Sequence, residues 1–437
     1  MLFAGVEGGG TSTTVALSCD GQLLGTKTGG ASNPFLLGEN AVVIISSMIR
    51  DLVQTLVPEN LWTTKSPPLR AVVMTMSGFG RREDAAALEA AVLSSGLAQE
   101  CVVAGDGAGP LECLHAWLSL HRNRNRDRNR NRNSYSEDGG GDGRGEGDAP
   151  NNTMPPTHGV VLISGTGSAC FCYDLTQNTE STETTMKNSN EKNCKDDAIA
   201  IFRERFSKYQ ARAGGRGHLM GDHGSAYWIG QQALSAAFLA QDGMLTRPSE
   251  LALVDIATEF YDVETLPELI PLLHETSQGK TRIAAFAERV VDEARTNVSS
   301  DATYEIVVEA AEWLARMTSA VIPSPSVRSR SSASASASAS ASASASASTL
   351  AEDVHVVVLL VGSVWKSFDM LRDSYMERLM LPTAESTIDL VRLEGTAAFG
   401  CLEAAVRLFG NEQQAVSLTE LAANSAVKID SKRGLEL

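Results

Sequence analysis

Short, continuous apolar runs recur along the chain and predict buried β-strands. They cover residues 2–6, 15–17, 101–104, 160–163, 169–172 and 354–361. Asp20-Gly21 separates residues 15–19 from residues 22–25. Because this dipeptide is a favoured two-residue turn, the segments on either side are expected to form a hairpin.

Apolar residues at helical spacing lie between several of these runs. They predict helices over residues 82–95, 225–241 and 304–317. A fourth helix is expected after the last apolar run, with an apolar face formed by Trp365, Phe368, Leu371 and Tyr375. Strands that alternate with helices in this way are typical of an α/β fold.

Three polar tracts interrupt the pattern. From residue 121 the chain alternates Arg and Asn and then becomes acidic and glycine-rich, residues 174–197 are rich in Thr, Asn and Ser, and residues 332–348 alternate Ser and Ala. Such tracts cannot bury enough apolar surface to fold, so they are predicted to be disordered surface inserts. The inserts then span residues 121–157, about 174–198 and 323–350, and they leave two domains, residues 1–120 and residues 158–437.

Composition and charge limit the classes of molecule that this protein is expected to bind. The chain has 437 residues, 43% of them hydrophobic, which is enough for the cores of two domains. With 37 Lys and Arg against 53 Asp and Glu, the net charge of −16 argues against nucleic-acid and acidic-membrane partners. No apolar run approaches the roughly 18 residues of a membrane span, and no leader-like segment opens the chain, so a cytoplasmic protein is expected.

The seven cysteines are odd in number and lack C-x-x-C spacing, so reduced thiols are expected rather than a disulfide framework or a zinc site. Cys170 and Cys172 would share one face of a strand. Small apolar packing is the favoured role for this pair, and ligation of a metal or cluster is the alternative.

Two glycine-rich turns stand between pairs of predicted strands. The first has the sequence GVEGGGT (residues 5–11) and the second SGTGS (residues 164–168). Glycine lets the backbone bend so that amide N–H groups face an anion, and Thr11 adds a hydroxyl, so both turns are candidate phosphate loops. A third turn, Gly362-Ser363, leads into a helix, whose free N–H groups also favour an anion. Glycine turns are also common for structural reasons alone.

An acidic residue, Asp106, follows the predicted strand 101–104 within the sequence GDGAG (residues 105–109). At a strand end among small residues, its carboxylate is expected to face a crevice. The alternative is a turn carboxylate that is satisfied by backbone amides.

The triplet Gly279-Lys280-Thr281 resembles the end of a P-loop but fails its other requirements. His274 stands where the first glycine of that motif belongs, and no strand precedes the triplet. We therefore assign it no phosphate-binding role from the sequence.

Four motifs together resemble the sugar kinase, Hsp70 and actin ATPase superfamily, and more narrowly the N-acetylglucosamine kinases of the BadF/BadG/BcrA/BcrD ATPase type. They are residues 5–11, 159–168, 220–229 and 361–367, in the order of the family. The resemblance implies two RNase H-like domains of the actin-like ATPase type, with ATP and a sugar in a cleft that closes between them.

The resemblance also assigns roles by position. It implies an ATP site formed by Gly9, Gly10, Thr11, Gly165, Thr166, Gly167, Gly362, Ser363 and Ser367. It implies a sugar site formed by Asn33, Asp106, Ser168, Ala169, Gly215, Arg216, Gly217 and Asp222. Asp106 matches the catalytic base of the family, which would take the proton of the attacking sugar hydroxyl. Mg²⁺ would bridge the phosphates, with Glu7 orienting its water ligands.

Several of these residues have structural alternatives. Asp222 precedes the helix predicted from residue 225, so helix capping is as good an explanation as sugar binding. Asn33 lies before a proline, as turn residues often do. Trp228 and Trp365 are expected in the core.

The chain departs from the family at three positions that bear on the sugar. Arg216 replaces a tryptophan, His223 replaces a glutamate, and Ala169 replaces a side chain that can bind the sugar. Sugar specificity therefore stays open. Arg216 would meet an anionic group of the substrate or, as we favour, pair with a neighbouring acid at the surface.

The leading hypothesis is phosphorylation of the 6-hydroxyl of N-acetyl-D-glucosamine by ATP, which yields the 6-phosphate and ADP in amino-sugar salvage. Glucosamine or a related amino sugar is the nearest variant, and a homodimer is left open. A second class is an ATPase activator of an acyl-CoA dehydratase or reductase, which would hold an iron–sulfur cluster on paired cysteines. A sugar sensor without activity is the third.

Overall fold

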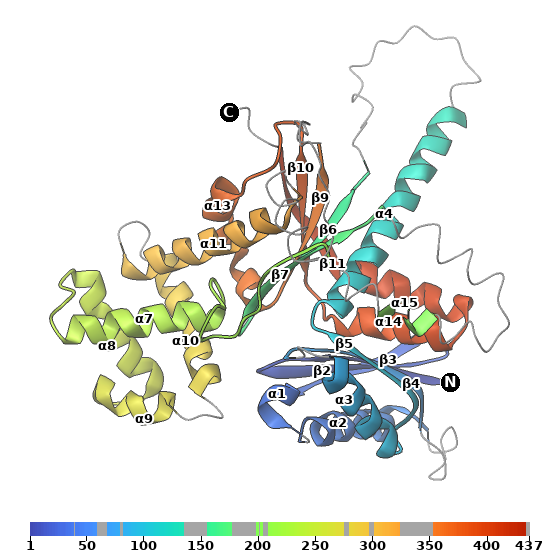
Figure 1. Cartoon of the computed structure of the whole chain (residues 1–437), viewed down its shortest axis with the longest axis horizontal. Helices are drawn as coiled ribbons and strands as arrows, with labels where there is room; N and C mark the ends of the chain where they lie inside the picture. The colour runs from blue at the N-terminus through green and yellow to red at the C-terminus, as the bar shows by residue number, and fades with distance from the viewer. Residues whose placement is uncertain are drawn as a thin grey trace, which may run out of the picture.

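The computed structural model describes residues 1–38, 40–58, 68–78, 82–134, 155–176, 198–200, 202–203, 209–274, 279–296, 301–323 and 353–433. Two sheets form its centre, and helices cover their faces (Figure 1). None of the helices in this part of the chain has the length and apolar character needed to span a bilayer.

The first sheet has the strand order β3-β2-β1-β4-β5. Its strands are β1 (Leu2–Gly8), β2 (Ser12–Cys19), β3 (Gln22–Gly30), β4 (Leu69–Met76) and β5 (Ala98–Gly105). Strands β1, β2 and β3 pair antiparallel, whereas β4 and β5 run parallel to β1. The predicted Asp20-Gly21 hairpin is confirmed, because Cys19 pairs with Gln22 and both turn residues have positive φ, as this turn type requires.

The second sheet repeats this order and adds one strand, giving β11-β10-β9-β6-β7-β8. Its strands are β6 (His158–Ser164), β7 (Ser168–Asp174), β8 (Ala211–Gly214), β9 (His355–Val361), β10 (Thr387–Leu393) and β11 (Ala426–Arg433). Again the first three strands pair antiparallel and the next two run parallel to the first. The prediction of two similar α/β units is confirmed.

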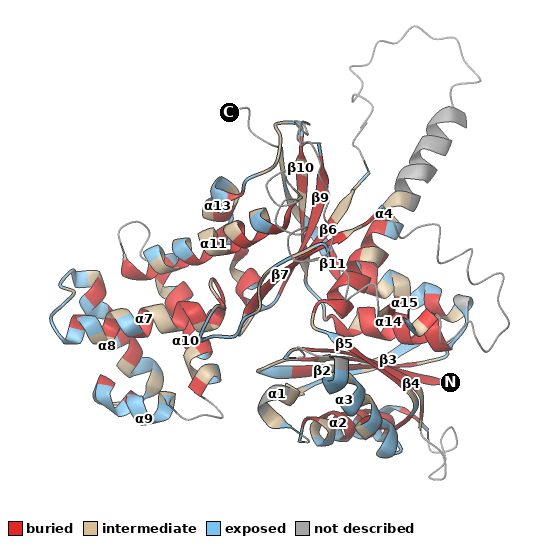
Figure 2. Ribbon diagram, viewed as in Figure 1, coloured by how far each residue is buried: buried red, intermediate tan, exposed pale blue. Residues whose placement is uncertain are grey.

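Three large apolar cores separate the layers, and the central strands of both sheets are largely buried, whereas the edge strands β3, β8 and β11 are mostly exposed or half-buried (Figure 2). One core lies between the first sheet and helices α2 (Asn40–Leu56) and α3 (Arg82–Ser94). The second fills the space between the sheets with α4 (Ala108–Ser134), α14 (Ala398–Phe409) and α15 (Glu412–Asn424). The third lies on the far side of the second sheet, beneath the helices between residues 226 and 321 and the helix at residues 368–378.

Helix α14 comes from the C-terminal part of the chain but packs against the first sheet. A Cβ atom at Gly5 of β1 would lie 2.2 Å from the carbonyl oxygen of Ala398. Only glycine allows the two backbones to approach so closely. The two ends of the chain therefore share one layer between the sheets.

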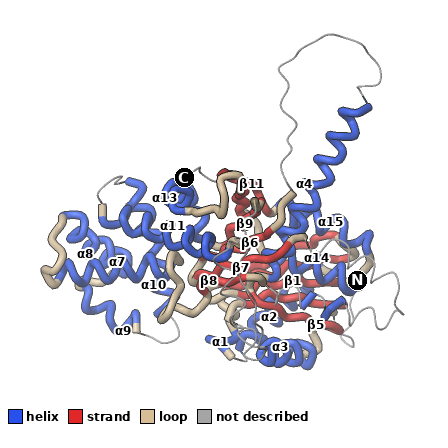
Figure 3. Tube along the Cα trace, turned by 45° about the horizontal axis from the view of Figure 1, so that its top comes forward, coloured by secondary structure: helices blue, strands red, loops and turns tan. Residues whose placement is uncertain are grey.

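A group of helices follows β8 and stands at one end of the molecule, beside the strands (Figure 3). It contains α7 (Ala226–Gln241), α8 (Pro248–Tyr261), α9 (Leu269–Leu273), α10 (Gly279–Thr296) and α11 (Ala302–Val321). Short 3₁₀ helices at Leu266–Glu268 and Ser363–Ser367, α1 (Pro34–Leu37) and α13 (Phe368–Arg378) complete the described elements.

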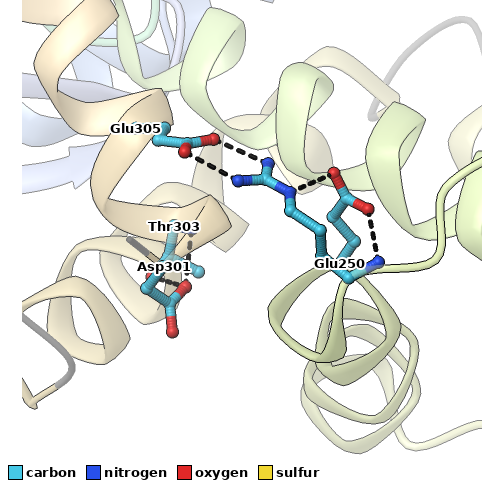
Figure 4. Close-up of polar contacts among 5 residues, drawn as sticks. Glu250, Asp301, Thr303 and Glu305 are labelled. Carbon is cyan, nitrogen blue, oxygen red and sulfur yellow. Dashed lines mark hydrogen bonds and ion pairs between the residues drawn. The ribbon is translucent and has the colours of Figure 1, made fainter. Parts of the chain in front are cut away.

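An arginine joins two of these helices at the surface. Arg247, just before α8, donates two hydrogen bonds to Glu305 of α11, at 2.8 and 2.7 Å, and a third to Glu250 at 2.7 Å (Figure 4). Nearby, Asp301 caps α11 by accepting the amide of Thr303 at 2.8 Å. These contacts hold the starts of α8 and α11 together.

Most of the predicted helices and buried side chains are confirmed. Helix α3 covers residues 82–94 of the predicted 82–95, α7 begins one residue after the predicted start, and α11 contains the predicted 304–317. Trp228 and Trp365 are buried in the third core, as expected. The six described cysteines are free thiols.

The predicted insert from residue 121 is wrong over its first part, because α4 continues to Ser134. The packed segment before residue 121 nucleates this helix, which is the unfavourable step of helix formation. Because arginine also has a high helix propensity, the polar tract can extend the helix. Residues 135–154, 177–197 and 324–350 of the predicted inserts lie outside the described residues.

Candidate active site

The two glycine turns face one another. Residues 9–11 join β1 to β2, and residues 165–167 join β6 to β7. The hydroxyl of Thr166 donates to that of Thr11 at 3.1 Å, although the two residues are 155 positions apart. The structure thus brings the two candidate phosphate loops to one place.

A cleft of about 1080 Å³ opens at this meeting point. Its walls include most of the site residues expected from the sequence, namely Glu7, Gly9, Gly10, Thr11, Asn33, Asp106, Gly165, Thr166, Gly167, Ser168, Ala169, Gly215, Gly217, Asp222, Gly362 and Ser363. Two expected residues, Arg216 and Ser367, are not among the lining residues. Helices α7 and α10 supply a further wall that the sequence did not predict.

Asp106 lies in the turn between β5 and α4 and is half-buried. Burial raises the pKa of its carboxyl group to about 6, while the charge of Arg212 and the amides of Asp106 and Gly107 act in the opposite direction. The carboxylate is thus a stronger base than an exposed aspartate and is still largely ionised at neutral pH. Both properties suit a general base.

Arg212 of β8 is a site residue that the sequence analysis missed. Its guanidinium donates to the carbonyl of Gly215 at 2.5 Å and lies 5.4 Å from the ring centre of Phe171. These contacts place a positive charge near Asp106 and support the backbone of a cleft-lining residue. Its position two residues before Gly214 was the only signal in the sequence.

Asp222 is held from two sides. Its Oδ1 accepts the amide of Ser168 at 3.2 Å, and its Oδ2 accepts from the ammonium of Lys280 at 2.7 Å. The alternative that Asp222 caps the following helix is wrong, because Ser225 is the N-cap of α7 and accepts the amide of Trp228. Asp222 instead joins the second glycine turn to α10.

Lys280 was set aside in the sequence analysis because its triplet is not a P-loop. Helix α10 begins at Gly279, and the described element before it is α9 rather than a strand. Nevertheless, Lys280 and Thr281 line the cleft. The triplet is therefore not a P-loop, but the fold still brings its lysine to the cleft wall.

Asn33 stands at the start of α1 and lines the cleft. Its side-chain amide donates to the hydroxyl of Ser77 at 3.2 Å. This contact orients the side chain from the end of β4, where Ser77 also lines the cleft. The residue is therefore held in place by more than its own turn.

Glu7 lies at the end of β1. Its Oε2 accepts hydrogen bonds from the hydroxyl of Thr396, at 2.5 Å, and from the amide of Ala397, at 2.9 Å. Burial raises the pKa of this carboxyl group, and these two hydrogen bonds oppose the effect. Glu7 thus ties the first sheet to the start of α14, and its role toward a metal stays a prediction.

Gly362 ends β9 beside the second glycine turn. Its φ is +110°, and a Cβ atom there would lie 2.3 Å from the carbonyl oxygen of Ser164. No other residue can take this position without moving the turn. Ser367, four positions after Ser363, begins α13 as its N-cap residue and makes no side-chain cap.

Arg216 is exposed and makes no hydrogen bond or ion pair within the described residues, so our favoured surface pairing is wrong there. It sits between Gly215 and Gly217, which line the cleft. His223, the second departure, packs its ring 4.4 Å from that of Trp313 rather than lining the cleft.

The chain was compared with known protein families, curated proteins and solved structures. No protein-family model matches the chain. Over 245 residues it is 24% identical to the N-acetylmuramic acid/N-acetylglucosamine kinase of Clostridium acetobutylicum. That match covers 56% of this chain and only 60% of the relative.

Two solved structures match a larger share. The first is a proposed N-acetylglucosamine kinase from Porphyromonas gingivalis, with a TM-score of 0.53 and 15% identity over 92% of this chain and 98% of the other. The second is a proposed N-acetylglucosamine kinase from Chromobacterium violaceum, with a TM-score of 0.53 and 18% identity over the same shares. The chain has the actin-like ATPase fold. At these identities the likeness establishes the fold alone, and the resemblance found in the motifs is confirmed at that level.

Proposed function

We propose that this protein is an ATP-dependent kinase that transfers a phosphoryl group to the 6-hydroxyl of N-acetyl-D-glucosamine. The products would be N-acetylglucosamine 6-phosphate and ADP, as in amino-sugar salvage. The observation that carries the proposal is Asp106, a half-buried carboxylate with a pKa of about 6 on the wall of a cleft that also contains two facing glycine turns.

The proposed reaction transfers one proton and one phosphoryl group. The Asp106 carboxylate accepts the proton of the sugar hydroxyl as its oxygen bonds to the γ-phosphorus of ATP. The bond between that phosphorus and the oxygen bridging to the β-phosphate breaks, and the electron pair leaves with ADP. Arg212 keeps Asp106 ionised near neutral pH.

The phosphates would lie between the two turns. Backbone amides of Gly9, Gly10, Gly165 and Gly167 are the proposed donors, with the hydroxyls of Thr11 and Thr166 beside them. Gly362 and Ser363 would line the nucleotide at the end of β9, and Ser367 would lie further along. The partly apolar wall of α7 and α10, with Leu234, Phe238 and Ile283, would face the adenine ring of ATP.

The described residues fit a magnesium ion that ATP itself largely holds. Glu7 and Asp106 are carboxylates on the cleft wall, and no group of three or more potential metal-ligating side chains occurs within the described part of the chain. Mg²⁺ commonly binds through phosphates, water and one or two carboxylates. When bound, it would neutralise phosphate charge, and Glu7 would orient its water ligands.

The sugar would lie near Asp106, beside Asn33, Ser168, Ala169, Gly215 and Gly217. A second candidate substrate is N-acetylmuramic acid, which carries a carboxylate and appears in the name of the Clostridium acetobutylicum relative. Arg216 supports this second substrate, because it is an exposed cation with no partner within the described residues and lies between two glycines that line the cleft.

The deciding experiment is ADP release from Mg·ATP by the purified protein with different acceptors. The panel contains N-acetylglucosamine, glucosamine, N-acetylmuramic acid, N-acetylmannosamine, glucose and no sugar. Stimulation by N-acetylglucosamine, with a 6-phosphate product identified by mass spectrometry and NMR, would support the proposal. Sugar-independent ATP hydrolysis would instead favour an ATPase activator.

The activator alternative needs accessible cysteines for a shared iron–sulfur cluster. Cys170 and Cys172 are fully buried in the third core, against helices of their own chain. Burial also raises the pKa of both thiols, which opposes the thiolate form that ligates iron. These observations favour the kinase.

A further inference from the structure

Lys280 is the only lysine or arginine among the described residues that line the cleft. It is the second residue of α10, and its side chain is 27% exposed. Its ammonium group lies 2.7 Å from Oδ2 of Asp222 and 5.8 Å from the ring centre of Tyr227 of α7. The proposed roles of the cleft leave this lysine unused.

The partner of Lys280 is wedged against the second glycine turn. The side chain of Asp222 is only 5% exposed, and its Oδ1 accepts the amide of Ser168 at 3.2 Å. A Cβ atom at Gly167 would lie 2.9 Å from the same oxygen. Any displacement of the Asp222 carboxylate is therefore transmitted to residues 165–168.

The backbone of Asp222 adds to this restraint. Its φ is +59°, in the left-handed region that non-glycine residues rarely adopt. Surrounding contacts must hold a residue in such a conformation. The ion pair with Lys280 and the hydrogen bond from Ser168 are two of them.

On its other side, Lys280 belongs to a stiff helical wall. Helices α7 and α10 touch through their backbones, because a Cβ atom at Gly230 would lie 2.0 Å from the carbonyl oxygen of Ile283. Both helices line the cleft through residues such as Gln231 and Thr281. The ion pair is therefore a short path from this wall to the turn that carries Ser168 and Ala169.

We infer that Lys280 is a positioning residue that couples the two ligands of the cleft. This inference rests on the proposed function, in which the nucleotide contacts the wall of α7 and α10 and the sugar contacts the region of Ser168. A nucleotide that orders the start of α10 also fixes Asp222, and Asp222 fixes the turn beside the sugar. Without Lys280, the buried carboxylate loses the ion pair that it makes within the described residues, and the path is broken.

The test measures binding rather than turnover. Isothermal titration gives the dissociation constant of N-acetylglucosamine with and without the nonhydrolysable analogue Mg·AMPPNP. Coupling between two sites commonly amounts to about 5- to 150-fold in affinity, and an increase in this range is expected for the wild type. In Lys280→Met, the ratio of the two constants should fall toward one, whereas Lys280→Arg should retain most of it.

Lys27→Met is the matched control. It removes a lysine–aspartate pair of similar length, 2.8 Å to Asp51, but both side chains are exposed and neither lines the cleft. It should keep the wild-type ratio. Lys280→Gln retains a polar group and replaces Lys280→Met if thermal denaturation shows the latter to be unfolded. It too should lose the coupling.

The outcomes separate the two proposals. Equal coupling in the wild type and in the neutral Lys280 variants, or no coupling in the wild type, overturns the role of Lys280 while the kinase proposal stands. A wild-type protein that binds neither ligand overturns the proposed function, and the coupling role falls with it.

Discussion

The first and second sheets place a glycine turn at the same point, between their first two strands. Residues 9–11 occupy this position in the first sheet and residues 165–167 in the second. The next parallel strand also ends in a serine-glycine pair in both, Ser77-Gly78 after β4 and Gly362-Ser363 after β9. A repeated topology thus delivers two similar backbone surfaces to one cleft.

The side chains that the two units bring differ. The first unit supplies to the cleft wall the carboxylates of Glu7, on β1, and Asp106, directly after β5. The second unit supplies Lys280 and its partner Asp222 to that wall, and Arg212 of β8 adds a charge that acts on Asp106. Lys280 stands on the helical group between β8 and β9, and the described residues at the corresponding point of the first unit, between β3 and β4, form α1 and α2. The shared topology positions the two glycine turns, whereas the charged side chains around them differ between the two units.

Asp106→Asn should have the largest effect, because it removes the proposed general base that the first unit brings to the cleft. We expect kcat to fall by about 10²- to 10⁴-fold while binding of the sugar and of Mg·ATP persists. Steady-state kinetics and titration calorimetry would check this. Asp51→Asn, at an exposed position outside the cleft, is the control, and near-normal turnover of Asp106→Asn would remove Asp106 as the base.

Gly362→Ala tests the backbone contribution of the second sheet. The added Cβ would lie 2.3 Å from the Ser164 carbonyl at a φ of +110°. A strained position of this kind costs about 1–3 kcal/mol, and we expect a rise of roughly 5- to 150-fold in KM for ATP.

Gly243→Ala is the matched control for that substitution. Gly243 also has a positive φ, +76°, but no atom lies within 4 Å of its added Cβ, and it does not line the cleft. It should lower the melting temperature slightly and leave KM unchanged. Equal effects of the two variants on KM would contradict the proposed role of Gly362.

Arg212 links the two sheets, because its positive charge on the second sheet lowers the pKa of the proposed base, Asp106, at the end of the first. Burial raises the pKa of Asp106 to about 6, and the base acts only when ionised. We therefore expect kcat/KM to fall as the pH drops through about 6. Arg212→Met removes a charge that lowers this pKa, so the acid limb should move to higher pH, and Arg212→Lys should move it less. An unmoved limb in Arg212→Met would show that the two groups are not coupled.

The surface network of Arg247 should matter least. It belongs to the helical group between β8 and β9, which has no counterpart among the described residues of the first unit, but Arg247 and Glu305 are both about half-exposed and do not line the cleft. Exposed ion pairs contribute little to stability. Arg247→Met should therefore change the melting temperature only slightly and leave turnover unchanged. A loss of activity would show that the start of α8 communicates with the cleft.

Much of the fold was predictable because its signals are local. The continuous apolar run of β9, the apolar face of α11 and the Asp20-Gly21 turn each act over a few neighbouring residues. The glycine turns were equally legible, since glycine marks where the backbone bends. The tract from residue 121 misled because composition alone does not show that a packed helix already precedes it.

Arg212 and Lys280 could not be predicted as site residues from the chain alone. Strand β8 is only four residues long and not strongly apolar, and the motif around Lys280 fails the rules for a P-loop. For Asp222 the sequence left sugar binding and helix capping as equal alternatives, because a carboxylate just before a helix is commonly a cap. What these side chains contact depends on elements far away along the chain.

The sequence by itself predicted seven strands (β1, β2, β3, β5, β6, β7 and β9), four helices (α3, α7, α11 and α13) and the glycine turns, because backbone preference and apolar periodicity operate within a few residues. Tertiary structure alone decided which side chains meet. The pairs Lys280–Asp222, Thr166–Thr11 and Thr396–Glu7 are 58, 155 and 389 positions apart. Such contacts form only when both sheets and the helices between them have packed, since no local preference specifies a partner at that distance.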